Sequence, residues 1–279
     1  MPKNFNPENI VLAKDFDASK LIYNDVKILD NGGKMVFLSY NNPRSPLIIQ
    51  TPEMPAPFGM SKWVNDNSPD KYTIDLSFRG MDNHPGVRAL YNVMDTLDKK
   101  LVEDGFANQQ TWFKGKKFPS VEVMQVLYTP FIRQAKDKDT GEVTDKYPPT
   151  FKVKLPVKEG VFECEVYDTN RELVDLNTIN TKGAGVSAII QCTGLWFAGG
   201  KFGANWQVVQ MRIRPTQKVS GFAFKEDPDD VQVQQDLDED LDEDENAVVK
   251  SVEDDVVSDS DDELEKTVKS SSKVVVKRR

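Results

Sequence analysis

Residues 186 to 215 read VSAIIQCTGLWFAGGKFGANWQVVQMRIRP. This stretch predicts two long β-strands joined by a glycine-rich connection at Ala198–Ala204. Long strands with glycine at the bends and a hairpin tip are how small, strongly curved barrels close. The stretch therefore indicates a curved antiparallel sheet as the centre of the fold.

Other strand-like runs are rich in β-branched and aromatic residues and are bounded by Gly, Pro or Asn, as is typical of strands. In Tyr72–Phe78 every second residue is large and apolar, which predicts a half-buried antiparallel strand. The predicted strands are Lys34–Tyr40, Pro46–Thr51, Tyr72–Phe78, Thr150–Pro156 and Val161–Asp168.

One segment has helical spacing. Apolar residues recur every three or four positions after the breaker at Asn83–Gly86 and form a single stripe: Val87, Leu90, Tyr91, Met94, Leu97 and Leu101. This predicts an amphipathic helix that ends near Gly105. Val121–Ile132 is apolar without a clear period, and Pro130 limits any helix there. The residues alone thus predict a mostly β (α+β) barrel with one amphipathic helix.

Charge divides the chain into two parts. Residues 1 to 225 hold 29 Lys and Arg against 25 Asp and Glu, about +4, and residues 226 to 279 hold 7 against 20, about −13. All Trp, Tyr and Phe lie at or before Phe224. A segment so charged and so poor in apolar residues cannot offset an ordering entropy of roughly 1–2 kcal/mol per residue. We predict a partly ordered segment at 1–18, a folded domain at 19–225 and a disordered acidic tail at 226–279.

The sequence contains no motif that indicates a catalytic site. The single histidine, His84, lies in a turn before the helix and has no motif around it. Gly183–Ala188 matches a dinucleotide-binding pattern, but a strand follows where that pattern needs a helix. Cys164 and Cys192 are expected to be half-buried, reduced thiols. We expect no enzyme, cofactor or metal, and neither a signal peptide nor a membrane span is evident, which predicts an intracellular protein that is not secreted.

Aromatic residues interleaved with lysines and glycines are the positive signal. Unpaired bases stack on flat side chains, and Lys or Arg holds the phosphates, so this mixture is typical of single-stranded nucleic-acid binding. For any one aromatic residue a place in the core remains an alternative. The candidate binding residues are Lys62, Trp63, Trp112, Phe113, Lys114, Lys116, Lys117, Trp196, Lys201, Phe202, Trp206, Arg212 and Arg214.

The acidic tail has two interpretations. A tethered polyanion competes with nucleic acid for the same cations and, once displaced, recruits partners, or it only keeps the chain soluble. Ser258 and Ser260 each have an acidic residue three positions downstream, which is the context that acidophilic kinases favour, so both are phosphorylation candidates.

The pattern resembles a known family. The segments that carry the resemblance are Pro46–Pro52, Ala56–Met60, Trp112–Phe113, Thr150–Pro156, Gly194–Phe197 and Lys201–Gln210, with the acidic tail. They resemble the single-stranded-DNA-binding proteins of large nucleocytoplasmic DNA viruses, which are similar to those of podovirus-type phages. The resemblance implies an OB-fold-like barrel with insertions and a role in viral DNA replication or recombination. An alternative for the whole chain is a virion or viral-factory scaffold whose tail binds basic partners. The expected partners are single-stranded DNA and, through the tail, replication proteins. The expected location is a viral replication site in the host cytoplasm or nucleus. No membrane partner is expected, and the oligomeric state is left open, with a dimer as one possibility.

Overall fold

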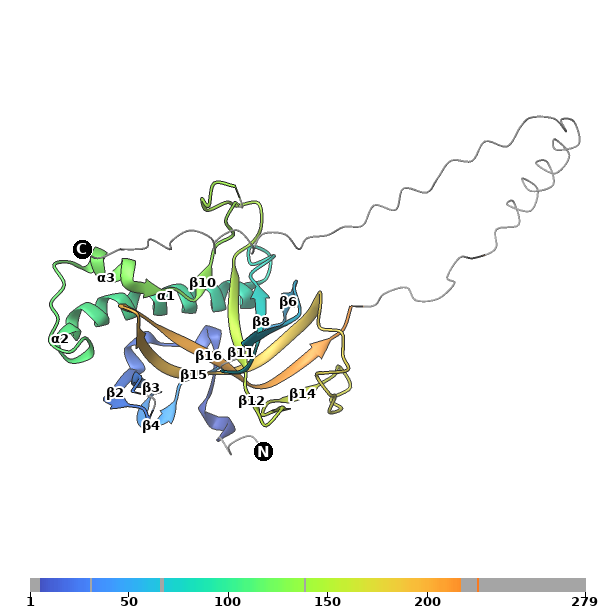
Figure 1. Cartoon of the computed structure of the whole chain (residues 1–279). Coiled ribbons are helices and arrows are strands. Elements are labelled where there is room, and N and C mark those ends of the chain that lie inside the picture. The colour runs from blue at the N-terminus through green and yellow to red at the C-terminus, as the bar shows by residue number, and fades with distance from the viewer. Residues whose placement is uncertain (1–5, 31, 66–67, 138, 217–224, 226–279) are drawn as a thin grey trace, which may run out of the picture. The chain divides into compact units, whose positions relative to one another are not determined.

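The computed structural model describes residues 6–30, 32–65, 68–137, 139–216 and 225 (Figure 1). The chain divides at Lys218, and the first unit is Met1–Lys218. The first unit holds the described helices and strands. The predicted acidic tail, with Ser258 and Ser260, lies outside the described residues, and the boundaries at 18 and 225 stay predictions.

The described elements follow one another along the chain. In order they are η1 (Pro7–Asn9), β1 (Ile10–Leu12), η2 (Ala13–Asp15), η3 (Ala18–Lys20), β2 (Leu21–Ile28), β3 (Lys34–Tyr40), β4 (Asn42–Pro46), β5 (Ile48–Gln50), β6 (Met54–Ala56), β7 (Met60–Asn65), β8 (Ser68–Ser77), α1 (Pro85–Ala107), α2 (Gln109–Trp112), α3 (Val121–Leu127), β9 (Tyr128–Thr129), β10 (Ile132–Arg133), β11 (Thr150–Leu155), β12 (Val157–Lys158), β13 (Val161–Phe162), β14 (Glu165–Tyr167), β15 (Ala184–Ala198) and β16 (Lys201–Arg214).

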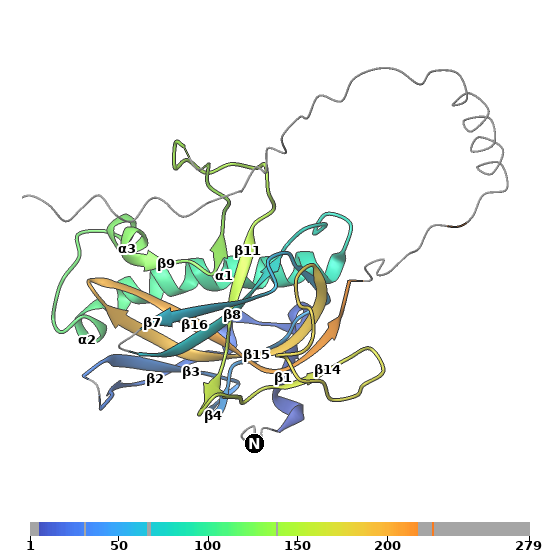
Figure 2. The ribbon, with the colours of Figure 1, turned by 45° about the vertical axis from the view of Figure 1, so that its right-hand side comes forward.

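The antiparallel hairpin of β15 and β16 is the centre of the sheet. Gly199 and Gly200 form its turn with φ of 58° and 78°, in the left-handed region that glycine adopts without strain. β15 pairs with β5 and β6 along its first part and with β3 along its second, while β16 pairs with β9, β11 and β14. Register shifts between Ile189 and Ile190, and between Cys192 and Gly194, mark bulges, which bend strands and increase their twist. The long strands can therefore be shared by two groups of neighbours, as Figure 2 shows.

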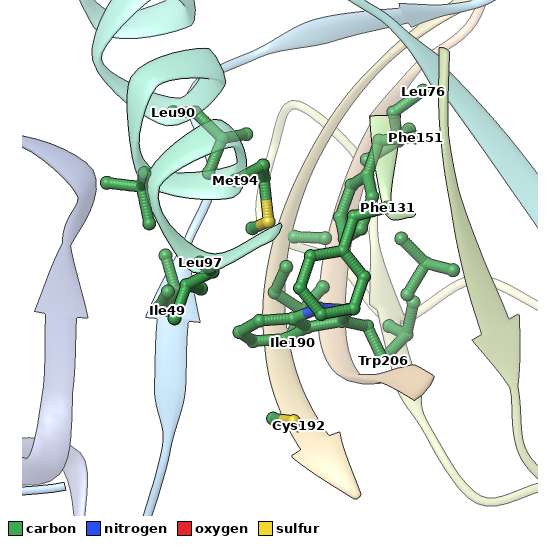
Figure 3. Close-up of a cluster of buried hydrophobic side chains, with 14 of the residues drawn as sticks. Ile49, Leu76, Leu90, Met94, Leu97, Phe131, Phe151, Ile190, Cys192 and Trp206 are labelled. Carbon is green, nitrogen blue, oxygen red and sulfur yellow. The ribbon is translucent and has the colours of Figure 1, made fainter. Parts of the chain in front are cut away.

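Helix α1 covers one side of this hairpin (Figures 1 and 2). Pro85 occupies its first turn, where a missing N–H costs nothing. The apolar stripe is buried, with Tyr91 half-buried at its border. Figure 3 shows Leu90, Met94 and Leu97 facing Ile190 and Trp206 of the hairpin. Full burial of each such aliphatic side chain stabilises the fold by roughly 1.5–3 kcal/mol.

The predicted class, a mostly β (α+β) domain with one long amphipathic helix, is confirmed. The OB-fold-like antiparallel barrel stays a prediction. Lys34–Tyr40 is a strand with the predicted bounds. Val161–Asp168 was expected as one strand but is two, because Phe162 pairs back onto β12 while β14 pairs with β16. The sequence pattern did not indicate β2. No helix in the described ranges is long and apolar enough to cross a membrane.

Asp98 ties the segment after β9 to α1. Its carboxylate accepts hydrogen bonds from the Tyr128 hydroxyl (2.7 Å) and from the backbone N–H groups of Phe131 (2.9 Å) and Ile132 (3.4 Å). Burial nevertheless raises the pKa of Asp98 to about 6, because the loss of solvent outweighs these hydrogen bonds.

The stability of the fold should therefore depend on pH through Asp98. The pKa of Asp98 is about 6 in the folded state against an ordinary 3.8, so the folded state binds the proton more tightly. The stabilisation of the fold by this proton is therefore complete below pH 3.8 and is lost as pH rises through 6. The difference corresponds to up to about 3 kcal/mol. The free energy of unfolding of the wild type minus that of Asp98→Asn, measured with urea, should fall between pH 4 and 7. Glu103→Gln, at an exposed position of the same helix, is the control for loss of a surface charge. A difference for Asp98→Asn that does not change with pH would contradict the account.

Candidate functional site

Alternate residues of β11, β16 and β15 point away from α1 and form a polar surface, the open face. Lys154 of β11 pairs with Gln207 of β16, and Gln207 pairs with Gln191 of β15. Because paired residues point to the same side of a sheet, these three side chains form a row. Their neighbours along the strands point the other way and are buried in the core: Val153, Leu155, Trp206, Val208, Ile190 and Cys192.

The row continues onto the hairpin of β7 and β8. Thr73 pairs with Lys154, and Lys71 pairs with Trp63, so these residues also belong to the open face. The Lys71 ammonium lies 5.9 Å from the centre of the Trp63 ring. This end of the open face therefore combines lysines with an exposed aromatic ring.

Lys71 and Lys154 form no ion pair within the described part of the chain. Burial and, to a lesser extent, the positive charge of Lys71 lower the pKa of the Lys154 ammonium. The neighbouring Lys152, in contrast, is paired with Asp75 at 3.4 Å. Two lysines that repel each other near one edge of the sheet mark a place where a bound anion would be stabilised.

Two hollows lie along the open face. The first, the Phe37 hollow, has a volume of about 750 Å³ and is lined by Met35, Phe37, Gln191, Thr193 and Gln207, among others. The second, the Tyr167 pocket, has a volume of about 520 Å³ and is lined by Gln50, Tyr167, Arg171, Ser187, Ile189, Gln210 and Arg212, among others. The ammonium of Lys27 lies 5.3 Å from the centre of the Phe37 ring. Both hollows thus combine an aromatic ring with nearby cations.

Three of the predicted stacking residues are in the core, and for them the prediction is wrong. Trp112, Phe202 and Trp206 are only 4%, 0% and 2% exposed. Phe113 is half-buried and contacts Phe202 edge-on at 5.3 Å. The rings of Trp112 and Phe202 hold the hairpin tip against α2 and β9. Trp206 packs against Phe131 farther along β16. A hairpin that long needs such apolar contacts beyond its own strand pairing.

The predicted lysines near the tip remain at the surface. Lys114, Lys116, Lys117 and Lys201 are all exposed. Lys34 caps α2, with its ammonium donating to the carbonyls of Thr111 (2.8 Å) and Trp112 (2.6 Å). Burial, and then the charge of Lys114, lower the pKa of Lys34. The structure therefore gathers cations around the tip, while the aromatic residues there serve packing.

Of the other predicted residues, Trp63, Trp196 and Arg212 lie on the open face. Trp63 is 66% exposed, and Trp196 is half-buried over Gly203. The remaining two are occupied by acidic partners. Lys62 is paired with Asp70 at 2.8 Å, and Arg214 is bound by Glu53.

The sequence prediction missed Lys71, Lys154, Tyr167 and Arg171. The alternation of Thr150–Pro156 carries a signal for one of them, since it puts Lys154 on the polar side of a strand. The other three needed the strand pairings. Within the described residues, no cluster of three or more His, Cys, Asp or Glu side chains could hold a metal ion.

The sequence matches a family of unknown function (DUF5871) over residues 86–227, just over half of its length. The chain belongs to this family. The matched segment contains α1, β11, β14, β15 and β16, and hence most of the open face.

An uncharacterized protein of Acanthamoeba polyphaga mimivirus is 28% identical over 193 residues, which cover 66% of this chain. The chain spans only 29% of that relative's length. Among solved structures, the chain is similar to the single-stranded DNA-binding protein of bacteriophage Enc34 in complex with single-stranded DNA (16% identity, 73% of this chain and 100% of that chain, TM-score 0.38). It is also similar to gp2.5, a single-stranded DNA binding protein encoded by bacteriophage T7 (12% identity, 74% and 100%, TM-score 0.35).

The assignment of Trp112 to the core and of Trp63 to the surface can be tested by measuring the free energy of unfolding of variants. Trp112→Ala should lower the free energy of unfolding by about 3–5 kcal/mol, because it leaves a cavity in the tip cluster. Trp63→Ala should change it by no more than about 0.5 kcal/mol. Urea unfolding followed by circular dichroism measures both, and similar losses for the two variants would contradict the assignment.

Proposed function

We propose that this chain binds single-stranded DNA along the open face, without catalysis. The observation that carries the proposal is the pair Lys71 and Lys154, two cations without an acidic partner among the described residues, held side by side on the open face. A phosphate backbone supplies the anions that this arrangement lacks. The partly buried pairs Lys152–Asp75 and Lys100–Asp104 show that lysines elsewhere in the fold do receive acidic partners.

The two hollows supply sites for bases. An unpaired base stacks on any flat side chain, and such a contact contributes about 1–3 kcal/mol. Phe37 and Tyr167 lie in the hollows, while Trp63 and Trp196 lie nearer the ends of the open face. From Ser187 to Trp196, β15 spans roughly 30 Å. This length accommodates several nucleotides of extended single-stranded DNA, in keeping with the roughly 4–16 nucleotides that one OB-fold binds.

Duplex DNA fits the open face less well. Its bases are stacked on each other inside the helix, so rings in a hollow gain no contact with them. A protein that uses both rings and lysines prefers unpaired strands, as expected of a protein that coats DNA during replication or recombination. We propose that this role belongs inside the cell, at a site of viral DNA replication.

The acidic tail adds a second element to the proposal. Residues 226 to 279 carry 20 Asp and Glu against 7 Lys and Arg. A polyanion on the same chain has an effective concentration up to the millimolar range near the lysines of the open face, and so competes with DNA. Displacement of the tail by DNA would free it to bind replication proteins. A shortened chain that ends at Lys225 should therefore bind DNA more tightly than the full chain.

Fluorescence anisotropy of a labelled dT oligonucleotide tests the proposal. Lys71→Ala with Lys154→Ala should weaken binding and make the slope of log K against log salt less steep by about 1.4, since each phosphate contact to a single strand contributes about 0.7. The matched control is Lys14→Ala with Lys99→Ala, two exposed lysines on or beside α1. Equal binding by the two double variants would contradict the assignment of the open face.

Absence of binding by the wild type and by the shortened chain at low salt would overturn single-stranded DNA binding altogether. In that case a scaffold, with its tail on a basic partner, would be the better account.

A further inference from the structure

The Tyr167 pocket has a floor made of two rows of paired residues. One row runs Tyr167, Arg212, Ser187 across β14, β16 and β15. The next row runs Glu165, Gln210, Ile189 and Gln50 and adds β5; all of its members except Glu165 line the pocket. Since neighbouring strands lie about 4.8 Å apart, the row across three strands spans about 10 Å.

A hydrogen-bond network fixes the polar side chains of this floor. One carboxylate oxygen of Glu165 accepts both from the Tyr167 hydroxyl (3.0 Å) and from the Gln210 amide nitrogen (3.0 Å). The Gln210 amide oxygen is left without a hydrogen-bond partner in the described structure and is available as an acceptor. The Tyr167 ring is held by its hydroxyl and by its place in β14, so it offers an aromatic surface that does not need to be ordered on binding.

Thr51 braces the wall of the pocket. Its backbone N–H donates to the Ala188 carbonyl (2.8 Å), and its hydroxyl accepts from the Ala188 N–H (2.9 Å). These two bonds join the end of β5 to β15 beside Ser187. The pocket is therefore largely formed before any ligand enters.

Arg171 reaches the pocket from a tight turn after β14. Asp168 organises the turn by accepting from the backbone N–H groups of Asn170 (2.8 Å) and Glu172 (2.9 Å). Arg171 itself has a backbone φ of 68°, a left-handed conformation that is unfavourable for residues other than glycine. A strained residue that the surrounding turn enforces is a common feature of binding sites.

Two guanidinium groups in the pocket have no acidic partner among the described residues. Glu53, which also lines the pocket, is taken up by Arg214. Arg171 and Arg212 form no ion pair with any residue that the structure describes, although both line the pocket. A guanidinium matches the geometry of a phosphate group and binds it through two parallel hydrogen bonds.

We infer that the Tyr167 pocket binds one whole nucleotide of the DNA strand, with its phosphate between Arg171 and Arg212 and its base against Tyr167 and Ile189. This inference rests on the proposed function and adds a fixed anchoring point to it. Elsewhere on the open face the DNA strand contacts separate lysines and aromatic rings. In the Tyr167 pocket the phosphate and the base of the same nucleotide are both bound. The pocket thereby sets where a bound strand is anchored.

Ser187→Cys supplies a direct probe. The natural thiols are protected, because burial raises the pKa of Cys164 to about 11 and that of Cys192 to about 12. The introduced thiol, on the pocket floor, should therefore be the reactive one in the folded full-length chain. A saturating dT oligonucleotide should slow its alkylation by a maleimide at least about fivefold, the lower end of what one base contact contributes. Thr96→Cys, exposed on α1, is the control whose alkylation rate should not change.

Arg171→Ala gives an independent measurement. It should weaken binding of the dT oligonucleotide and reduce the salt slope by about 0.7. Lys182→Ala, an exposed cation outside the pocket lining, should leave both unchanged. Arg171→Gly relieves the backbone strain and also removes the guanidinium, so it should lose affinity like Arg171→Ala. Affinity retained in Arg171→Gly but lost in Arg171→Ala would show a backbone effect and overturn the phosphate contact.

The outcomes separate this inference from the proposed function. If the wild type binds the oligonucleotide but the Ser187→Cys thiol is not protected, the pocket inference fails and the open face stands. If the thiol is protected by dTMP and not by the oligonucleotide, the pocket takes free nucleotides and the inference fails as well. If the wild type binds no single strand, both fail together.

Discussion

The pairing of β15 with β16 is the contact on which the other elements depend. β3, β5 and β6 pair with the first of these strands, and β9, β11 and β14 pair with the second. Such long strands would twist out of contact with their neighbours if they were regular. The bulges at Ile189 and at Cys192 redirect them, so that one hairpin serves two groups of strands.

The same pairing separates packing from binding. One side of the hairpin is apolar and lies under α1, where Ile190 and Trp206 are buried (Figure 3). The other side is lined with amides, hydroxyls and cations, and it stays open. Because side chains alternate along a strand, a shift of one residue in the pairing would exchange the two sides. The apolar contacts with α1 therefore fix which residues the open face presents.

Much of this could be predicted from the sequence, since strand and helix periodicity are local properties. Lys34–Tyr40 and the helix stripe from Val87 to Leu101 are where the pattern placed them. Local patterns do not say which aromatic ring another segment will cover, so they predict Trp112 and Phe202 as contact residues although both pack the hairpin tip. Likewise Lys71 and Lys154 are 83 positions apart, and only the pairing of β8 with β11 makes them neighbours.

Photo-cross-linking of a dT oligonucleotide carrying 5-iodouracil, followed by mass spectrometry of the peptides, tests the central claim most directly. The account predicts cross-links at rings of the open face, namely Phe37, Trp63, Tyr167 and Trp196, that disappear as salt is raised. Cross-links confined to α1, on the opposite side of the hairpin, would contradict it.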